Sequence, residues 1–149
     1  MSASMDVDVE TSIEIARPRA QVAAFAADPD NVHRWYRNIK RVDWLTDRPL
    51  RVGTRLAFAA EFFGRRMAYT YEIVEHVPGE RLVMRTADGP FPMETTYLWV
   101  DGPAGTTLMA LRNRGRPAGL SAIAAPMMAA GVRRANRADL RRLKAALES

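Results

Sequence analysis

Three of the four tyrosines lie at alternating positions in segments that have the pattern of β-strands. Tyr69 and Tyr71 are two residues apart and Tyr97 lies on a later segment, so we expect all three on one inner face of a sheet. A tyrosine hydroxyl can donate a hydrogen bond to a carbonyl oxygen and polarise it. Arg66 or Arg85 would stabilise an enolate if either pointed inward. These residue types suggest chemistry on a carbonyl compound, provided that a proton acceptor lies nearby.

The same alternation sends the charged groups of these strands to the outer face. Alternate positions of a strand point to opposite faces, and the positions expected to point outward (here said to have outward parity) include Glu61, Glu72, Glu94, Arg66 and Arg85. A general acid or base needs a pKa tuned by burial or by a charged partner, within hydrogen-bond reach of the substrate. The inner face offers tyrosines and threonines instead, so we expect it to orient a ligand well and to move protons poorly. The catalytic residues therefore stay unassigned.

Other catalytic and metal-binding patterns are missing from the sequence. It contains no nucleophile elbow, HExxH motif, glycine-rich phosphate loop or EF-hand spacing. His33 lies among charged and polar residues and His76 follows Glu75, so solvated positions are expected for both. Two histidines and no cysteine argue against a dedicated zinc or iron site. We expect no metal and no cofactor.

Length and composition fit one domain that covers residues 1–149. The absence of cysteine excludes disulfides and is compatible with a reducing cytosol. Residues 1–10 are acidic and polar, unlike a secretory signal. The uncharged stretch over residues 118–132 is shorter than the roughly 20 residues that a bilayer span requires. We therefore expect a soluble, cytoplasmic protein with no membrane span.

The net charge of +5 arises from a strong excess of arginine, with 20 arginines and 2 lysines. The arginines are scattered except near the C-terminus, where Arg133, Arg137 and Arg141 lie four residues apart on a predicted helix. Nucleic-acid binding predicts basic residues gathered on one face and interleaved with exposed aromatics. A solvated outer face is the favoured interpretation of the stripe, and a phosphate track is the alternative. No nucleic-acid partner is expected.

The hydrophobic periodicity predicts the elements that position these residues. Six or seven antiparallel strands are expected, covering residues 6–15, 39–45, 54–62, 66–73, 81–87, 91–100 and 106–114. Two short helices should follow the first strand: one begins at Pro18 and ends before Asp28, and another is capped by Asp30 or Asn31. A long helix should run from 120 to 147, with Pro126 as a kink or a late first turn. Its core stripe is Leu140, Leu143 and Leu147.

Six short segments in this order resemble the START-like proteins of the SRPBCC superfamily that are grouped with polyketide cyclases and dehydrases. The segments are Ile15 to Val22, Asp28-Pro29, Trp35, Pro78 to Leu82, Gly105-Thr106 and Leu140 to Lys144. The resemblance implies an α+β helix-grip (Bet v 1-like) fold, in which a curved seven-stranded sheet surrounds a C-terminal helix. That family includes aromatase/cyclases, ligand carriers and hormone and quinone binders, so function has to be argued from the site.

The resemblance also implies a cavity between the sheet and the last helix. Large aromatics and methionines suit a planar or lipid-like ligand. For any single residue, core packing is the favoured interpretation, whereas the set as a whole predicts a pocket. Trp35 and Tyr36 either gate its entrance or anchor the second short helix, with neither favoured. The predicted ligand-binding residues are Trp35, Phe58, Phe62, Met67, Tyr69, Tyr71, Met84, Tyr97, Trp99, Met127 and Met128.

These observations favour a protein that binds a hydrophobic small molecule, lipid-like or aromatic and polyketide-like, in that cavity. The first alternative is a polyketide cyclase or aromatase-like enzyme that acts on a bound polyketone, where tyrosines polarise a carbonyl. A second is a protein-interaction module that uses the same groove. The residues give no indication of the oligomeric state.

Overall fold

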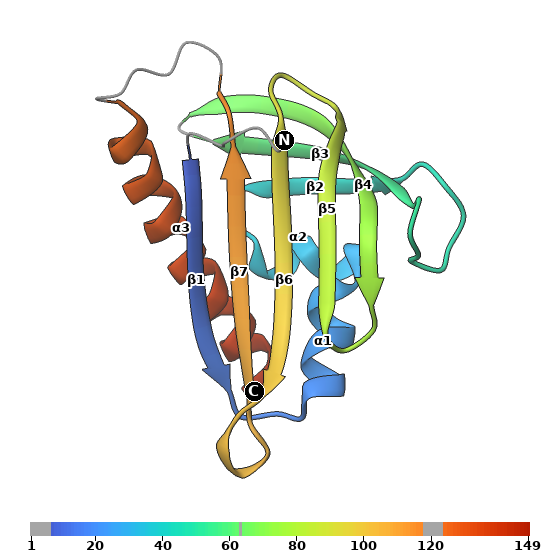
Figure 1. Cartoon of the computed structure of the whole chain (residues 1–149), viewed down its shortest axis with the longest axis vertical. Coiled ribbons are helices and arrows are strands. Elements are labelled where there is room, and N and C mark those ends of the chain that lie inside the picture. The colour runs from blue at the N-terminus through green and yellow to red at the C-terminus, as the bar shows by residue number, and fades with distance from the viewer. Residues whose placement is uncertain (1–6, 63, 118–123) are drawn as a thin grey trace, which may run out of the picture.

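Seven strands form one antiparallel sheet in the order β1-β7-β6-β5-β4-β3-β2. The computed structural model describes residues 7–62, 64–117 and 124–149. The sheet curls, so that β2 and β3 run across the direction of β6 and β7 (Figure 1). The strands are β1 (Val7–Ile15), β2 (Ile39–Trp44), β3 (Arg55–Phe62), β4 (Arg65–Val77), β5 (Arg81–Asp88), β6 (Met93–Asp101) and β7 (Thr107–Gly115).

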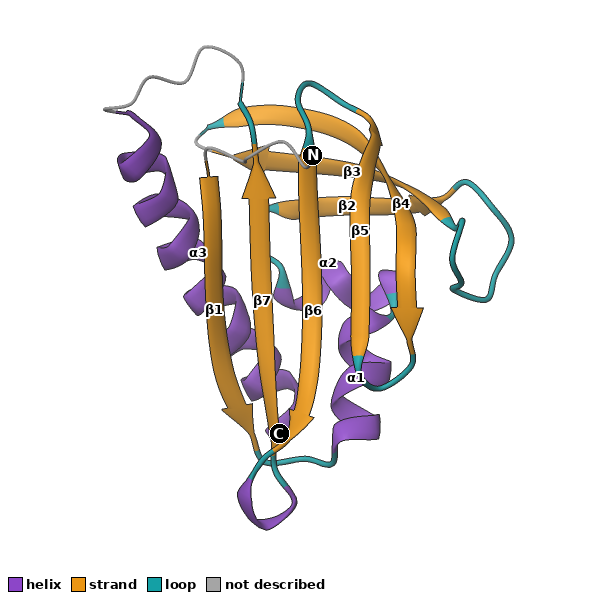
Figure 2. Ribbon diagram, viewed as in Figure 1, coloured by secondary structure: helices purple, strands orange, loops and turns teal. Residues whose placement is uncertain are grey.

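The curl coincides with irregular pairing in β4 and β2. β4 is longer than the sequence predicts, and its register with β5 shifts between Thr70 and Tyr71 and again between Ile73 and Glu75. β2 has a similar shift between Ile39 and Arg41. An extra residue in one strand bends it and increases its twist, so these shifts fold the β2–β4 side of the sheet over the inner face (Figure 2).

Two short helices connect β1 to β2. α1 (Arg19–Ala27) follows Pro18, and α2 (Val32–Trp35) follows a 3₁₀ turn at Pro29–Asn31. The Asp28 carboxylate accepts a hydrogen bond from the backbone N–H of Asp30 at 2.9 Å and so begins this turn. Asn31, one of the two predicted positions, is the N-cap residue of α2, but its side chain makes no capping hydrogen bond.

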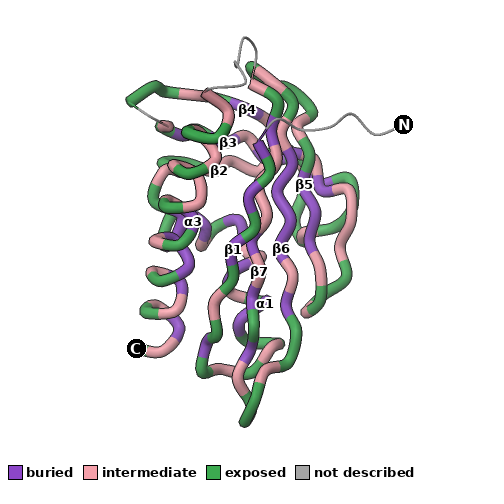
Figure 3. Tube along the Cα trace, turned by 60° about the vertical axis from the view of Figure 1, so that its left-hand side comes forward, coloured by how far each residue is buried: buried purple, intermediate pink, exposed green. Residues whose placement is uncertain are grey.

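The helix α3 (Ala124–Glu148) lies across the concave side of the sheet, against β1 and α2 (Figure 1). Leu140, Leu143 and Leu147 are buried, as their spacing predicts. Figure 3 shows buried positions along the inner side of α3 and exposed ones along its outer side. Pro126 lies near the start of the helix, while the predicted start at residue 120 lies outside the described residues. The α+β helix-grip fold is confirmed.

Candidate ligand-binding site

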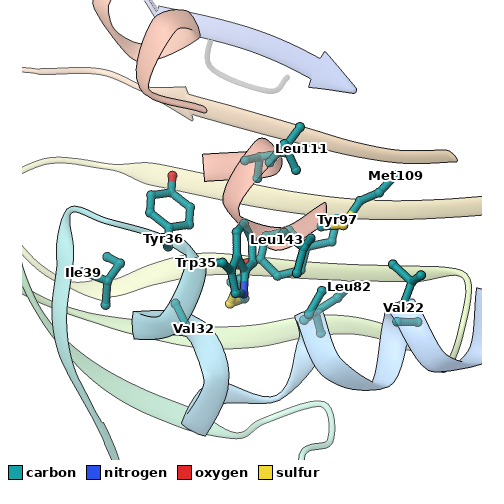
Figure 4. Close-up of a cluster of buried hydrophobic side chains, with 14 of the residues drawn as sticks. Val22, Val32, Trp35, Tyr36, Ile39, Leu82, Tyr97, Met109, Leu111 and Leu143 are labelled. Atoms are coloured by element: carbon teal, nitrogen blue, oxygen red, sulfur yellow. The ribbon is translucent and has the colours of Figure 1, made fainter. Parts of the chain in front are cut away.

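Aromatic side chains from α2, β3, β4 and β6 meet on the inner face of the sheet. Phe58 stacks on Tyr69 with ring centroids 5.2 Å apart, and Tyr71 lies edge-on to Tyr69 at 5.0 Å. Tyr97 contacts both Trp35 and Trp99, with centroids 5.7 and 6.0 Å apart. Figure 4 shows Trp35 beside Tyr97 and Leu143, which joins the cluster to α3.

The structure brings most of the predicted site residues into this cluster. Trp35, Phe58, Tyr69, Tyr71, Met84, Tyr97 and Trp99 are buried in it, and Phe62 and Met67 pack against it. Met127 is different, because it is 73% exposed. It precedes Leu140 by thirteen residues, about 3.6 helical turns, which places it on nearly the opposite side of α3. Met128 is only partly buried and does not belong to the cluster.

These side chains leave little space between the sheet and the helices. A cavity of about 10 Å³ is lined by Ala27, Pro29, Val32, Leu50, Leu56, Phe58, Ile73, Leu82, Met84 and Tyr97. This volume holds roughly one water molecule, whereas small-molecule pockets measure about 300–1,000 Å³. Side chains therefore have to move before a larger ligand can enter this space.

A chain of hydrogen bonds runs through the core from β4 to α3. The hydroxyls of Tyr71 and Thr95 are 2.9 Å apart, and Thr95 donates to the Asn113 Oδ1 at 2.7 Å. The Asn113 Nδ2 donates to the Tyr36 hydroxyl at 2.7 Å, which lies 3.4 Å from the Asn136 Oδ1. In Figure 4 the Tyr36 hydroxyl points away from Ile39, to the side on which Leu111 of β7 lies. Strands β4, β6 and β7 are thereby joined to α3 by polar side chains.

The number of hydrogens that each side chain can donate decides which group is the donor in each hydrogen bond of this chain. Thr95 has one hydroxyl hydrogen and gives it to Asn113, so Tyr71 must donate to Thr95. Tyr36 accepts from Asn113 and is left to donate to Asn136. The chain therefore ends on α3 with the Asn136 Oδ1 satisfied. The Nδ2 of Asn136 is buried and has no partner within the described structure.

Further donors on the inner face also lack an acceptor. The indole N–H groups of Trp35 and Trp99 are buried without a partner in the described part of the chain. The hydroxyls of Tyr69 and Tyr97 make no hydrogen bond with any described residue, although both side chains are buried. Buried polar groups are normally hydrogen-bonded, so the described inner face holds more donors than its own acceptors satisfy.

The tyrosines remain protonated over the physiological range. Burial raises the pKa of Tyr71 to about 12, although its hydrogen bond with Thr95 opposes the shift. Burial likewise raises the pKa of Tyr36, Tyr69 and Tyr97 well above the usual value, and the nearby tyrosines add to the effect. All four hydroxyls therefore keep their proton and are neutral.

Asp139 on α3 is a buried carboxylate that the sequence reasoning missed. It is 1% exposed. Its Oδ1 forms an ion pair with Arg142 and accepts the backbone N–H of Arg37 at 3.2 Å, while its Oδ2 has no partner among the described residues. Burial raises the pKa of Asp139, and the bonds from Arg37 and Arg142 only partly offset this. Its charge in turn raises the pKa of Tyr36 and Tyr97.

The helical period could have revealed both polar residues on α3. Asn136 precedes Leu140 by four residues and Asp139 precedes Leu143 by four, so both fall on the leucine stripe. A polar residue in phase with a core stripe must find partners inside the protein. Thr95 and Asn113 could be found in the same way, from their inward parity on β6 and β7.

Among the charged groups with outward parity, Glu94 is buried rather than solvated. Glu94 bonds to Arg85 at 2.6 Å and to Arg114 at 3.2 Å, across neighbouring strands. Burial alone would raise the pKa of Glu94, but the two guanidinium groups outweigh this and hold its pKa below the usual range. Arg66 and Glu61 are exposed. None of these groups joins the inner polar chain.

Replacing Asp139 with Asn should change how stability depends on pH. Because the folded state raises this pKa, deprotonation costs more in the folded than in the unfolded chain. The unfolding free energy of the parent, relative to Asp139→Asn, should therefore fall as the pH rises from below the usual aspartate pKa through the raised one. Thermal or denaturant unfolding of both proteins across this window measures the difference.

Asp8 supplies a control of opposite sign. Its hydrogen bond from Arg112 lowers its pKa, so the parent should gain stability over Asp8→Asn as the pH rises through this pKa. A slope of the same sign for both variants would show that Asp139 is not destabilised by burial.

The described residues contain neither a cluster of metal ligands nor a helix that could span a membrane. No group of three or more histidines, aspartates or glutamates there could hold a metal ion. His33 is exposed, and His76 is partly exposed on β4. None of the described helices is long and apolar enough to cross a bilayer.

Known proteins share this architecture. The fold is similar to that of the protein TTHA0849 from Thermus thermophilus, with 14% identity, a TM-score of 0.80 and coverage of 94% and 96% of the two chains. The fold is also similar to that of a START superfamily protein from Mycobacterium smegmatis, with 15% identity, a TM-score of 0.80 and coverage of 95% and 97% of the two chains. For the Zhui aromatase/cyclase from Streptomyces sp. R1128, the identity is 20%, the TM-score is 0.78, and the coverage is 95% and 93% of the two chains. Likeness at these identities shows the fold alone.

The family of the chain is identified from its sequence. No curated protein matches it. The model of one family, described as polyketide cyclase / dehydrase and lipid transport, matches residues 6–148. This match spans nearly the whole chain, and the helix-grip fold agrees with it. The chain therefore belongs to the polyketide cyclase/dehydrase and lipid transport family.

Proposed function

We propose that this protein binds a hydrophobic small molecule between the sheet and α3, and that the ligand carries carbonyl oxygens on an apolar, lipid-like or aromatic body. The observation that carries the proposal is the surplus of buried donors. Trp35, Trp99 and Asn136 present N–H groups without an acceptor within the described structure. An unpaired buried donor costs about 1–3 kcal/mol, which a ligand oxygen would recover.

The chemistry of the surrounding wall supports the apolar part of this ligand. The buried cluster combines aromatic rings that pack edge-on or stacked with Met84 and Met109. Aromatic rings give a large contact area and methionine adapts to irregular shapes. A flat molecule can replace ring–ring contacts with contacts of the same kind.

Ligand entry requires a rearrangement, because the cavity of about 10 Å³ is far below ligand size. One wall of this cavity is Ala27, Pro29 and Val32, which belong to the short helical segment between β1 and β2. Trp35 is fully buried at the end of this segment, which supports its role as an anchor. We expect this segment and the adjacent core side chains to move together when a ligand enters.

The proposal is tested by titrating naphthalene and 1,4-naphthoquinone, which differ in two carbonyl groups on a similar ring system. Naphthoquinone should bind more tightly, by up to about tenfold for each hydrogen bond of 0.5–1.5 kcal/mol. Tyr97→Phe keeps the ring and removes one free donor, so it should weaken naphthoquinone by up to the same factor and leave naphthalene unchanged. Quenching of tryptophan fluorescence reports both titrations.

Two results would contradict this proposal. Equal affinity for the two probes would show that the donors do not meet the ligand. Binding that survives both Tyr71→Trp and Tyr97→Trp would place the ligand elsewhere, because these changes add volume to a nearly full space.

A second candidate function is that of a cyclase or aromatase-like enzyme acting on a bound polyketone. The observation that favours it is Asp139, a buried carboxylate with a raised pKa and a free Oδ2. Such a group has the character of a general base. Multiple turnover of a polyketone mimic, abolished by Asp139→Asn, would establish this function over simple binding, for which we expect no turnover.

A further inference from the structure

Four arginines cover the outer side of α3, opposite the interior site. Arg133, Arg134, Arg137 and Arg141 form this surface, here called the arginine face. They lie within about 100° of the helix circumference, on the side turned away from the buried Leu143. Figure 3 shows this side of α3 as exposed or partly exposed along its length. The face holds four positive charges, compared with a net charge of +5 for the whole chain.

Arginines elsewhere in the fold mostly have carboxylate partners. On the strands, Arg55 pairs with Glu72 and Arg112 with Asp8. On α3 itself, Arg142 pairs with Asp139. The four members of the arginine face have no hydrogen bond or ion pair to any part of the chain that the structure describes. Their mutual repulsion is therefore not offset within the described protein, and an anionic partner would relieve it.

The shape of the arginine face indicates an extended partner. A hollow of about 310 Å³ is lined by Ala130 and the four arginines. All five residues belong to one helix, so the hollow is a groove between neighbouring side chains and has no opposite wall. A small anion would be held from one side only, whereas a broad charged surface can contact all four guanidinium groups together.

The apolar residues on this side of α3 favour a bilayer. Met127 lies at the N-terminal end of the arginine face and is 73% exposed. Ala130 lies one turn later and is also exposed. A helix that carries arginines beside exposed apolar side chains is suited to the membrane interface, where the charges meet anionic headgroups and the apolar groups enter the acyl boundary.

We propose that the arginine face docks the protein on membranes that contain anionic phospholipids. Each arginine near such a surface strengthens binding by about 1 kcal/mol, about fivefold in affinity. Four arginines with little apolar area give weak, reversible and salt-sensitive attachment. None of the four arginines lines the interior cavity, so the docking and the interior ligand would use different side chains.

Sedimentation with vesicles tests the proposal. The full chain should bind vesicles of phosphatidylcholine mixed with an equal amount of phosphatidylglycerol, and should not bind vesicles of phosphatidylcholine alone. Arg134→Glu/Arg137→Glu should weaken binding by more than about 20-fold, since two attractions are lost and two repulsions are added. Arg134→Gln/Arg137→Gln should show an intermediate loss. Salt at about 1 M should abolish binding of the parent.

A matched control is Arg41→Glu/Arg51→Glu, which changes the net charge equally at exposed positions on the β2 side of the sheet. It should retain most of the binding. Equal loss in the two double variants would reduce the effect to net charge and overturn the proposal. Preference for a DNA duplex or polyglutamate over anionic vesicles, lost in Arg134→Glu/Arg137→Glu, would assign the face to another polyanion. Unchanged thermal midpoints and naphthoquinone binding in the variants separate this result from misfolding and from the interior site.

Discussion

Leu143→Ala should lower the free energy of unfolding by about 2–5 kcal/mol, the range for truncating a buried leucine. Leu143 is fully buried on α3, in the cluster that includes Trp35 and Tyr97. The change removes apolar contacts and leaves a space that rigid aromatic neighbours can fill only in part. Chemical denaturation of parent and variant measures the loss.

Leu45→Ala is the matched control, because Leu45 follows β2 and is 56% exposed. Its cost should stay near the roughly 0.5 kcal/mol of ordinary surface changes. A loss below that value for Leu143→Ala would mean that α3 is not held to the sheet by its leucine stripe.

The position of α3 could be predicted because its leucines follow one period without interruption. The same holds for β1, where Val7, Val9 and Ile15 alternate with charged residues and are buried. Alternation and helical spacing depend on local geometry alone. They are therefore readable wherever one face of an element is buried and the other is solvated.

The bulges between β4 and β5 were not predictable in this way. Their shifts near Tyr71 and Glu75 depend on pairing with β5, a contact between segments that the local pattern does not describe. The polar chain is a similar case. Tyr36 and Asn113 meet only after the chain has curled, 77 residues apart in sequence. Sequence parity places each residue on a face but does not say which residue on another element it will meet.

The resemblance to a cavity-forming family predicted more open space than the structure contains. Family likeness determines the backbone arrangement, and the fold agrees with it. The volume left inside depends on side-chain size, and here large aromatics such as Phe58 and Tyr97 fill most of the inner face. A pocket of ligand size therefore depends on how readily these rings move, a property that neither the family nor the hydrophobic pattern specifies.

Loss of the Tyr36 hydroxyl, at the centre of the polar chain, should lower the free energy of unfolding strongly. Tyr36→Phe removes the acceptor of the Asn113 Nδ2 and the donor to the Asn136 Oδ1. Asn136 is 2% exposed and already has an unpartnered Nδ2 within the described structure, so the change leaves its whole amide unsatisfied. Because an unpaired buried group costs about 1–3 kcal/mol, the unfolding free energy should fall by about 2–3 kcal/mol in chemical denaturation.

Tyr69→Phe is the control that isolates this effect. Tyr69 is as buried as Tyr36 and lies in the same cluster, but its hydroxyl bonds to none of the described residues. Its removal should therefore cost less than about 0.5 kcal/mol, or stabilise the protein slightly by removing an unpaired donor. Equal losses in the two variants would mean that the chain from Tyr71 to Asn136 adds nothing beyond ring packing. A loss confined to Tyr36→Phe would show that the polar chain ties α3 to the sheet, and with it the Asn136 amide that we expect to meet the ligand.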